Sequence, residues 1–150
     1  MIFMRNRAAR IRVAAIIVEK DKILLLAHKK NNKVYWLLPG GGVKYGESLH
    51  EALKREAEEE LGIGVNIHDT GLILDSVDPG GKKHIVNICF FCSRAKGDYK
   101  IGKDKRLHSF GFFSADDIPD LPVFPPIKEE IKSILIGSYK KDIYLGARWI

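Results

Sequence analysis

The residues best suited to chemistry in this sequence are three glutamates in one short segment. Glu56, Glu59 and Glu60 are spaced i, i+3 and i+4, which places their side chains on one face of an α-helix. Neighbouring like charges on a helix repel by roughly a few tenths of a kcal/mol per pair. A divalent cation would reverse that cost, and Mg²⁺ prefers oxygen ligands. The spacing therefore suggests a metal site, although a solvated acidic helix face is a common alternative.

The residues before these glutamates favour the metal site. Three consecutive glycines occupy positions 40–42, Glu47 follows a few residues later, and Arg55 directly precedes Glu56. Glycine lets a backbone approach a ligand closely, so we expect Gly40 to contact the metal; a tight turn would explain the run equally well. Arg55 and Glu47 suit a bidentate ion pair that ties the glycine segment to the helix. Arg55 lies about 100° around the helix from Glu56, which aims it at that segment.

The segment that carries the glutamates has clear helix signals. Ser48 is suited to the N-cap, and Glu51 can complete a capping box. No Gly or Pro occurs within Leu49–Leu61, and Gly62 is placed to end the helix. Glu60 lies nearest the apolar stripe of this helix, so we expect it to be the least exposed of the three glutamates. The stripe consists of Leu49, Leu53, Ala57 and Leu61, and the side facing water holds Glu51, Lys54 and Glu58.

Residues 41–63 resemble the Nudix box, G-x5-E-x7-R-E-U-x-E-E-x-G-U, in which U is an apolar residue. All nine defined positions are filled, by Gly41, Glu47, Arg55, Glu56, Ala57, Glu59, Glu60, Gly62 and Ile63. The preceding residues 36–41, WLLPGG, are similar to the W-x-L-P-G-G lead-in common in that family. The box covers only 23 of the 150 residues, but nine specified positions make a chance match improbable.

The resemblance implies an enzyme that hydrolyses a nucleoside diphosphate linked to another moiety, using Mg²⁺ or Mn²⁺. Water would attack a phosphorus of the pyrophosphate link, with divalent ions activating the water and neutralising charge on the phosphates. Glu56, Glu59 and Glu60 would then be the metal ligands and catalytic residues, with Glu47 and Arg55 supporting them. A base is also required, and Glu59 or Glu56 could serve if not fully committed to the metal.

The identity of the base stays open because one family feature is missing. Several branches of the family take a further acidic residue from a loop well after the box. The matching region here, 103–113, reads KDKRLHSFGFF, and its only carboxylate is Asp104. The late glutamate is therefore absent or displaced. His108 is a second candidate, as base or phosphate contact, against the plainer interpretation of a loop histidine.

Two further residues near the box are candidates for substrate binding. Trp36 could stack on a nucleotide base, although most aromatic residues in strands belong to the core. Lys44 could contact a phosphate, although a solvated lysine is the commoner case.

Three functions are compatible with these residues. The first is hydrolysis of a small nucleotide derivative such as ADP-ribose, a dinucleoside polyphosphate or a (d)NTP. The second is a non-catalytic nucleotide-binding module, which the intact glutamate cluster argues against. The third is an enzyme that acts on RNA 5′ ends. The sequence shows no Lys/Arg cluster interleaved with aromatic residues, so we do not expect nucleic acid as a partner.

The distribution of elements predicts one α/β domain spanning residues 1–150. Strands on both sides of the central helix, with a second helix late in the chain, suggest an α/β/α sandwich around a mixed sheet. The Nudix resemblance implies the same architecture. Strands are expected at 11–18, 23–27, 34–38, 65–75, 84–93 and 110–113, tight turns at 19–22 and 78–81, and a helix at 127–136.

Composition and charge indicate the class of protein and its cellular location. The chain is 45% hydrophobic and 29% charged, as expected of a soluble globular protein, and its net charge of +6 suits an anionic substrate. No apolar run is long enough for a signal peptide or a membrane span, so we expect a cytoplasmic protein. Cys89 and Cys92 are three apart in a strand, which predicts two reduced thiols on opposite faces. The apolar tail at 144–149 should pack on the domain or form a homodimer contact.

Overall fold

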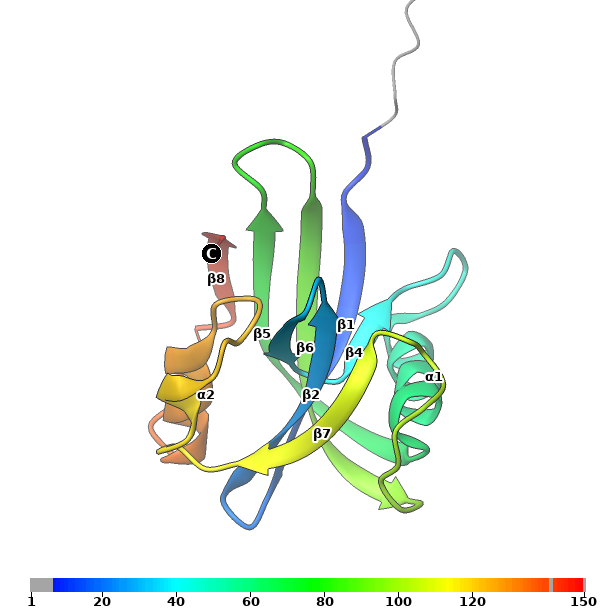
Figure 1. Ribbon diagram of the computed structural model, residues 1–150, viewed down its shortest axis with the longest axis vertical. Coiled ribbons are helices and arrows are strands. Elements are labelled where there is room, and N and C mark those ends of the chain that lie inside the picture. Colours follow the sequence, from blue (N-terminus) through cyan, green and yellow to red (C-terminus); the bar gives the residue numbers. More distant parts are fainter. Residues whose placement is uncertain (1–6, 141, 150) are drawn as a thin grey trace, which may run out of the picture.

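The computed structural model describes residues 7–140 and 142–149. Eight strands, two α-helices and a 3-10 turn follow one another in the order given next (Figure 1). They are β1 (Arg10–Glu19), β2 (Lys22–Lys30), β3 (Lys33–Leu37), β4 (Gly40–Gly42), α1 (Leu49–Leu61), β5 (Gly64–Val77), β6 (His84–Lys96), β7 (Leu107–Phe113), the 3-10 turn η1 (Ile118–Asp120), α2 (Lys128–Leu135) and β8 (Tyr144–Arg148).

The strands form one mixed sheet that is split near its middle. Its order is β3-β2-β1-β6-β5-β8, with β4 paired to β1 and β7 paired to β2. The β1–β6 and β5–β8 pairings are parallel, and the others are antiparallel. β1 and β2 pair only beside their hairpin, at Val18–Ile23 and Glu19–Lys22. Beyond that point the two strands separate, and β4 takes the place of β2 along β1.

The apolar residues of β1 explain why helices cover both faces. Residues 13–17 are fully or almost fully buried, as in a strand enclosed on both sides. Val13, Ala15 and Ile17 belong to one core with α1, and Ala14 and Ile16 belong to a second core with residues at the start of α2. Figure 1 shows α1 and α2 on opposite sides of the strands. The predicted α/β/α sandwich with a mixed sheet is confirmed.

The local signals in the sequence match the observed elements closely. Ser48 caps α1 in a complete capping box with Glu51, and Gly62 ends the helix with a left-handed φ of 67°. The β1–β2 turn uses Lys20 and Asp21 at positive φ, the backbone that a two-residue hairpin requires. Cys89 and Cys92 are both free and buried, one in each core. None of the helices in the described part of the chain has the length and apolar character needed to span a membrane.

Two elements were left open between alternatives by the sequence. The glycines at 40–42 form strand β4 rather than a turn. A β-carbon on Gly40 would lie 1.9 Å from the Val13 carbonyl oxygen, so only glycine allows this close approach to β1. The apolar tail forms β8, which pairs with β5 at the edge of the sheet. The tail therefore packs on the domain, and the homodimer contact stays a prediction.

Candidate active site

The guanidinium group of Arg55 joins α1 to the segment before it. Its Nε donates to Glu47 Oε2 at 2.7 Å and its Nη2 to Glu47 Oε1 at 2.9 Å, which is the predicted bidentate pair. Nη2 also donates to the carbonyl oxygen of Gly42 at 3.0 Å. The bonds from Arg55 and from the Lys44 backbone N–H lower the pKa of Glu47 to about 2. Glu47 is thus charged and fixed in place across the physiological pH range.

Arg55 also holds two of the three clustered glutamates. Its Nη1 donates to Glu56 Oε1 at 2.8 Å and to Glu59 Oε2 at 3.2 Å. The predicted contact of Arg55 with the glycine segment is confirmed, but its bonds to the two glutamates were not predicted. Its long side chain turns back over the helix and also donates to Glu56, the next residue in the chain. One cation consequently offsets the repulsion between Glu56 and Glu59.

Glu60 is the buried member of the cluster, as predicted. It is 8% exposed, whereas the side chains of Glu56 and Glu59 are 16% and 55% exposed. Its Oε1 accepts a 2.7 Å hydrogen bond from the backbone N–H of Gly40. Burial raises the pKa of Glu60 to about 8, and the nearby charge of Arg12 and the Gly40 N–H only partly oppose this. Glu60 therefore carries a carboxylate whose ionised form lacks a full counter-charge.

Strand β4 presents its backbone to α1. Val43 N donates to Ile11 O, and Ala15 N donates to Pro39 O, so alternate peptide groups bond to β1. The N–H of Gly40 faces Glu60 instead, and in an antiparallel pair its carbonyl lies on the same side. A β-carbon on Gly41 would meet the Glu56 carboxyl carbon at 2.3 Å. Glycine is thus required for the carboxylates and the strand to lie this close.

The loop between β6 and β7 completes the site. Lys100 N donates to Leu61 O at 3.0 Å, and Gly102 N donates to Glu60 O at 2.9 Å, which fixes the loop on the last turn of α1. A β-carbon on Gly102 would lie 1.9 Å from the Glu59 carbonyl oxygen. The loop and helix enclose a pocket of about 580 Å³. Its lining includes all three glutamates and Asp104.

Asp104 and His108 differ in their relation to this pocket. Asp104 lines it, but its carboxylate is bonded to the side chain and backbone of Arg106, which lowers the pKa of Asp104 to about 2. A carboxylate with so low a pKa is a weak base. His108 is exposed at the irregular β2–β7 pairing and does not line the pocket. The structure gives no contact that joins His108 to the glutamates, and its role stays a prediction.

Trp36 and Lys44 are not brought together with the glutamates. The Trp36 ring packs edge-on against Phe113, with centroids 4.7 Å apart, in the core on the α2 side. Lys44 is exposed, and its backbone N–H donates to Glu47 Oε1 at 2.8 Å. Their assignment as substrate contacts stays a prediction, and the core position of Trp36 favours a structural role.

Three residues beside the site were not predicted. Arg12 on β1 donates to Leu38 O at 2.7 Å, and its charge acts on Glu60. The buried Nε2 of His28 on β2 has no hydrogen-bond partner among residues 7–140 and 142–149, and Arg106 places its charge near both His28 and Glu60. These residues come from separate strands and a distant loop, so no local sequence pattern identifies them.

The donor set fits a hard divalent cation, although the side chains are not gathered around one point. Within residues 7–140 and 142–149, no three His, Cys, Asp or Glu side chains are arranged to hold a metal ion together. Glu56 and Glu59 point at Arg55, and Glu60 points at the Gly40 N–H. Carboxylate and carbonyl oxygens are the ligands that Mg²⁺ prefers, and the buried Glu60 needs a counter-charge. Binding would require these side chains to rotate away from their present partners.

The comparisons with known proteins identify the family. The NUDIX domain family matches residues 8–133, and the chain therefore belongs to the Nudix hydrolase family. The chain is 35% identical over 107 residues to the ADP-ribose pyrophosphatase of Methanocaldococcus jannaschii, which covers 70% of this chain and 62% of that protein. It is 31% identical to the NAD-capped RNA hydrolase NudC of Pectobacterium atrosepticum, over 71% of this chain and 38% of that protein. The match thus spans less than two thirds of either relative.

A solved structure shows the same fold. The MutT NUDIX hydrolase of Burkholderia pseudomallei is 27% identical to this chain, with a TM-score of 0.73. The likeness covers 89% of this chain and all of that one.

The raised pKa of Glu60 predicts a pH-dependent stability. Without a cation, the folded state holds the Glu60 proton up to about pH 8, whereas the ordinary pKa is 4.5. The folded state then binds more protons than the unfolded state, so the free energy of unfolding should fall as pH rises between these values. Glu60→Gln should flatten this slope and be the more stable form at pH 8. Urea unfolding in chelator at several pH values measures it. Glu59→Gln is the control, and equal slopes for wild type and Glu60→Gln would contradict the assignment.

The contacts of Arg55 predict that Arg55→Ala lowers activity more than Glu47→Gln does. Arg55→Ala removes the bonds to Glu47, Gly42, Glu56 and Glu59, whereas Glu47→Gln weakens only one part of this set. Loss of a supporting contact of this kind lowers activity by about 10- to 100-fold, so both variants should be impaired and Arg55→Ala more severely. The double mutant should be no worse than Arg55→Ala, because the shared interaction is already lost. Rates and unfolding free energies of all four proteins test this, and additive losses would show that the two residues act separately.

Proposed function

We propose that this protein hydrolyses the pyrophosphate bond of a nucleoside diphosphate linked to another moiety, using Mg²⁺ or Mn²⁺. The observation that carries this proposal is that Glu56, Glu59 and Glu60 all line one pocket beside the glycine strand, with Arg55 bonded to two of them. The substrate classes are those expected from the sequence: ADP-ribose, a dinucleoside polyphosphate or a (d)NTP. The likeness to an ADP-ribose pyrophosphatase supports ADP-ribose as the first compound to test.

The carboxylates differ in what each can do. Mg²⁺ or Mn²⁺, when bound by the glutamates and the Gly40 carbonyl, would neutralise phosphate charge and lower the pKa of the attacking water. Glu60 is buried and faces the backbone of Gly40, so its role is to hold the cation. Glu56 is confined by Gly41 and Arg55. We therefore assign both as metal ligands rather than as the base.

Glu59 is the best candidate for the base. Its side chain is 55% exposed and lines the pocket, and its bond to Arg55 is the longer of the two glutamate contacts, at 3.2 Å. It can reach a water molecule without leaving a buried position. Asp104 is less suitable because Arg106 already holds its carboxylate. We therefore assign proton abstraction from the attacking water to Glu59.

The cellular location and the partners of the enzyme are a further part of the proposal. We propose a cytoplasmic location, supported by two free, buried thiols, and a nucleotide-derived small molecule as the main partner. A homodimer would involve β8, the outermost strand on its side of the sheet.

Glu59 and Glu58 form a matched pair for testing the base. Both are exposed and both line the pocket, but only Glu59 has a bond to Arg55. Glu59→Gln should lower kcat on the order of 100-fold or more because it removes the proton acceptor, while melting temperature stays close to that of the wild type. Glu58→Gln should keep nearly full activity. Equal effects of the two changes on kcat would overturn the assignment.

Metal removal tests the proposed reaction itself. Activity on a panel of ADP-ribose, dinucleoside polyphosphates and (d)NTPs should vanish in excess chelator and return with Mg²⁺ or Mn²⁺, because the glutamates depend on a cation to bind phosphate. Release of the monophosphate product is the readout. Full turnover in chelator would exclude the metal-dependent mechanism. An inactive but nucleotide-binding protein would instead support the non-catalytic module.

A further inference from the structure

A second pocket, with a volume of about 410 Å³, lies at the opposite end of β3 from the glycine strand. This volume is within the range of roughly 300–1,000 Å³ that ligand pockets occupy. Its walls come from four segments far apart in sequence: the β2–β3 hairpin, the tip of the β5–β6 hairpin, the connector before α2 and the C-terminal tail. We call it the ring pocket because three aromatic side chains line it.

The three rings are Tyr35, Phe124 and Trp149. Phe124 is held beside β3, because Trp36 N donates to Pro122 O and Phe124 N donates to Trp36 O. Trp149 meets the Phe124 ring edge-on, with centroids 5.7 Å apart. All three aromatic residues are only partly buried. Partly exposed rings in a pocket are suited to stacking on the bases of a nucleic acid.

The lining of the ring pocket is also strongly basic. Lys30, Lys33 and Lys83 line it, and none of the lining residues is acidic. Lys83 lines an adjoining pocket as well, so the two pockets share one wall. Positive charge therefore extends over both pockets and favours an anionic ligand longer than a single nucleotide.

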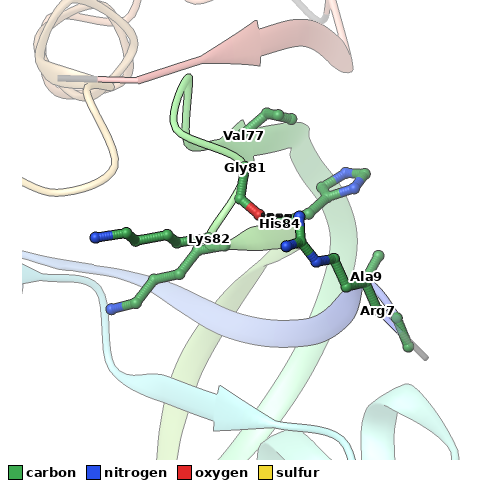
Figure 2. Close-up of a pocket in the computed structure, with 8 residues that line it drawn as sticks. Arg7, Ala9, Val77, Gly81, Lys82 and His84 are labelled. Carbon is green, nitrogen blue, oxygen red and sulfur yellow. Dashed lines mark hydrogen bonds between the residues drawn. The ribbon is translucent and has the colours of Figure 1, made fainter. Parts of the chain in front are cut away.

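Figure 2 shows this adjoining pocket, with Arg7, Lys82 and His84 around it. The carboxylates beside it already have partners. Asp75 accepts hydrogen bonds from Tyr144 and pairs with His84, and Asp78 accepts the backbone N–H groups of the β5–β6 turn. They therefore leave the lysine and arginine charges available to a ligand.

The ring pocket borders the residues around the carboxylate pocket. The Tyr35 ring lies 5.7 Å from the ring of His28, whose Nε2 is buried without a partner. Arg106 bonds through its carbonyl to Lys29 N, beside His28, and its side chain holds Asp104, which lines the carboxylate pocket. A ligand with its phosphates at the glutamates can thus continue past His28 to Tyr35.

A compact nucleotide with its phosphates at the glutamates would leave the three lysines of the ring pocket without an anionic partner. We propose that the ring pocket and its basic neighbour bind the nucleotides that follow the phosphorylated 5′ end of a single-stranded nucleic acid. The inference rests on the proposed function, which places the phosphates of a substrate at the carboxylate pocket. Bases stack on the rings, and the lysines contact the phosphodiester chain. The sequence predicted no such partner because only the fold brings Lys83, Phe124 and Trp149 to Lys30, Lys33 and Tyr35.

Binding of a 5′-monophosphorylated ten-nucleotide RNA, which needs no hydrolysis, tests the lysines. The variant K30Q/K33Q/K83Q should bind at least tenfold more weakly. Its log–log salt dependence should be shallower by about 2, since each single-strand phosphate contact contributes about 0.7. The matched control is K20Q/K22Q/K54Q, which loses the same charge from residues that line none of the three pockets described above. The control should change affinity less than twofold.

Stacking is tested separately at Trp149. Trp149→Ala should weaken RNA binding on the order of tenfold, whereas Trp149→Phe should keep most of it because a ring remains. Binding of poly-glutamate should not respond to Trp149→Ala. Melting temperatures of all variants establish that the fold is intact.

The outcomes separate this inference from the proposed function. Hydrolysis of ADP-ribose with no RNA binding would overturn the inference and leave the function standing. RNA binding that both lysine variants weaken equally, or that poly-glutamate displaces as well as RNA does, would also overturn it. RNA binding lost in the ring-pocket variants, in a protein that hydrolyses no pyrophosphate, would support the site while the proposed function fails.

Discussion

The site depends on one guanidinium group. Arg55 donates to Glu47, to the Gly42 carbonyl and to two of the clustered glutamates, so it links three segments of the chain. Arginine suits this role because its donors lie in a rigid plane and its charge does not titrate. A lysine would offer one point charge and could not span the same partners. Without this group, Glu56 and Glu59 would repel each other, and the glycine strand would lose the bond from Gly42 to α1 and keep only the one from Gly40 to Glu60.

The split in the sheet determines where the glycine strand meets α1 and its glutamates. Because β1 and β2 pair only beside their hairpin, β4 can lie along β1 and present its backbone to α1. The glycines are what make this possible, since a β-carbon on Gly40 would collide with β1 and one on Gly41 with Glu56. The buried Glu60 then meets the Gly40 N–H rather than water. The same glycines therefore allow both the close packing of β4 against β1 and the close approach of the carboxylates to β4.

The sequence predicted what depends on neighbours along the chain. The capping box at Ser48, the helical face of the glutamates, the burial of Glu60 and the Glu47–Arg55 pair all follow from short spacings. It could not predict what depends on distant segments. The pairing that makes β4 a strand, the place of Asp104 beside the glutamates and the core position of Trp36 each require the fold. The ring pocket is a further case, because only the fold brings Lys83, Phe124 and Trp149 to the hairpin segment that carries Lys30, Lys33 and Tyr35.

The central claim is that Arg55 and the glycine strand prepare Glu56, Glu59 and Glu60 for a divalent cation. Anomalous diffraction from crystals soaked in Mn²⁺ tests this most directly, because it locates the ion without reference to activity. The account predicts a peak at coordination distance from the carboxylates of Glu56 and Glu60, with the Glu47–Arg55 pair unchanged. The absence of a peak there at saturating Mn²⁺, or a peak held by other residues, would contradict it.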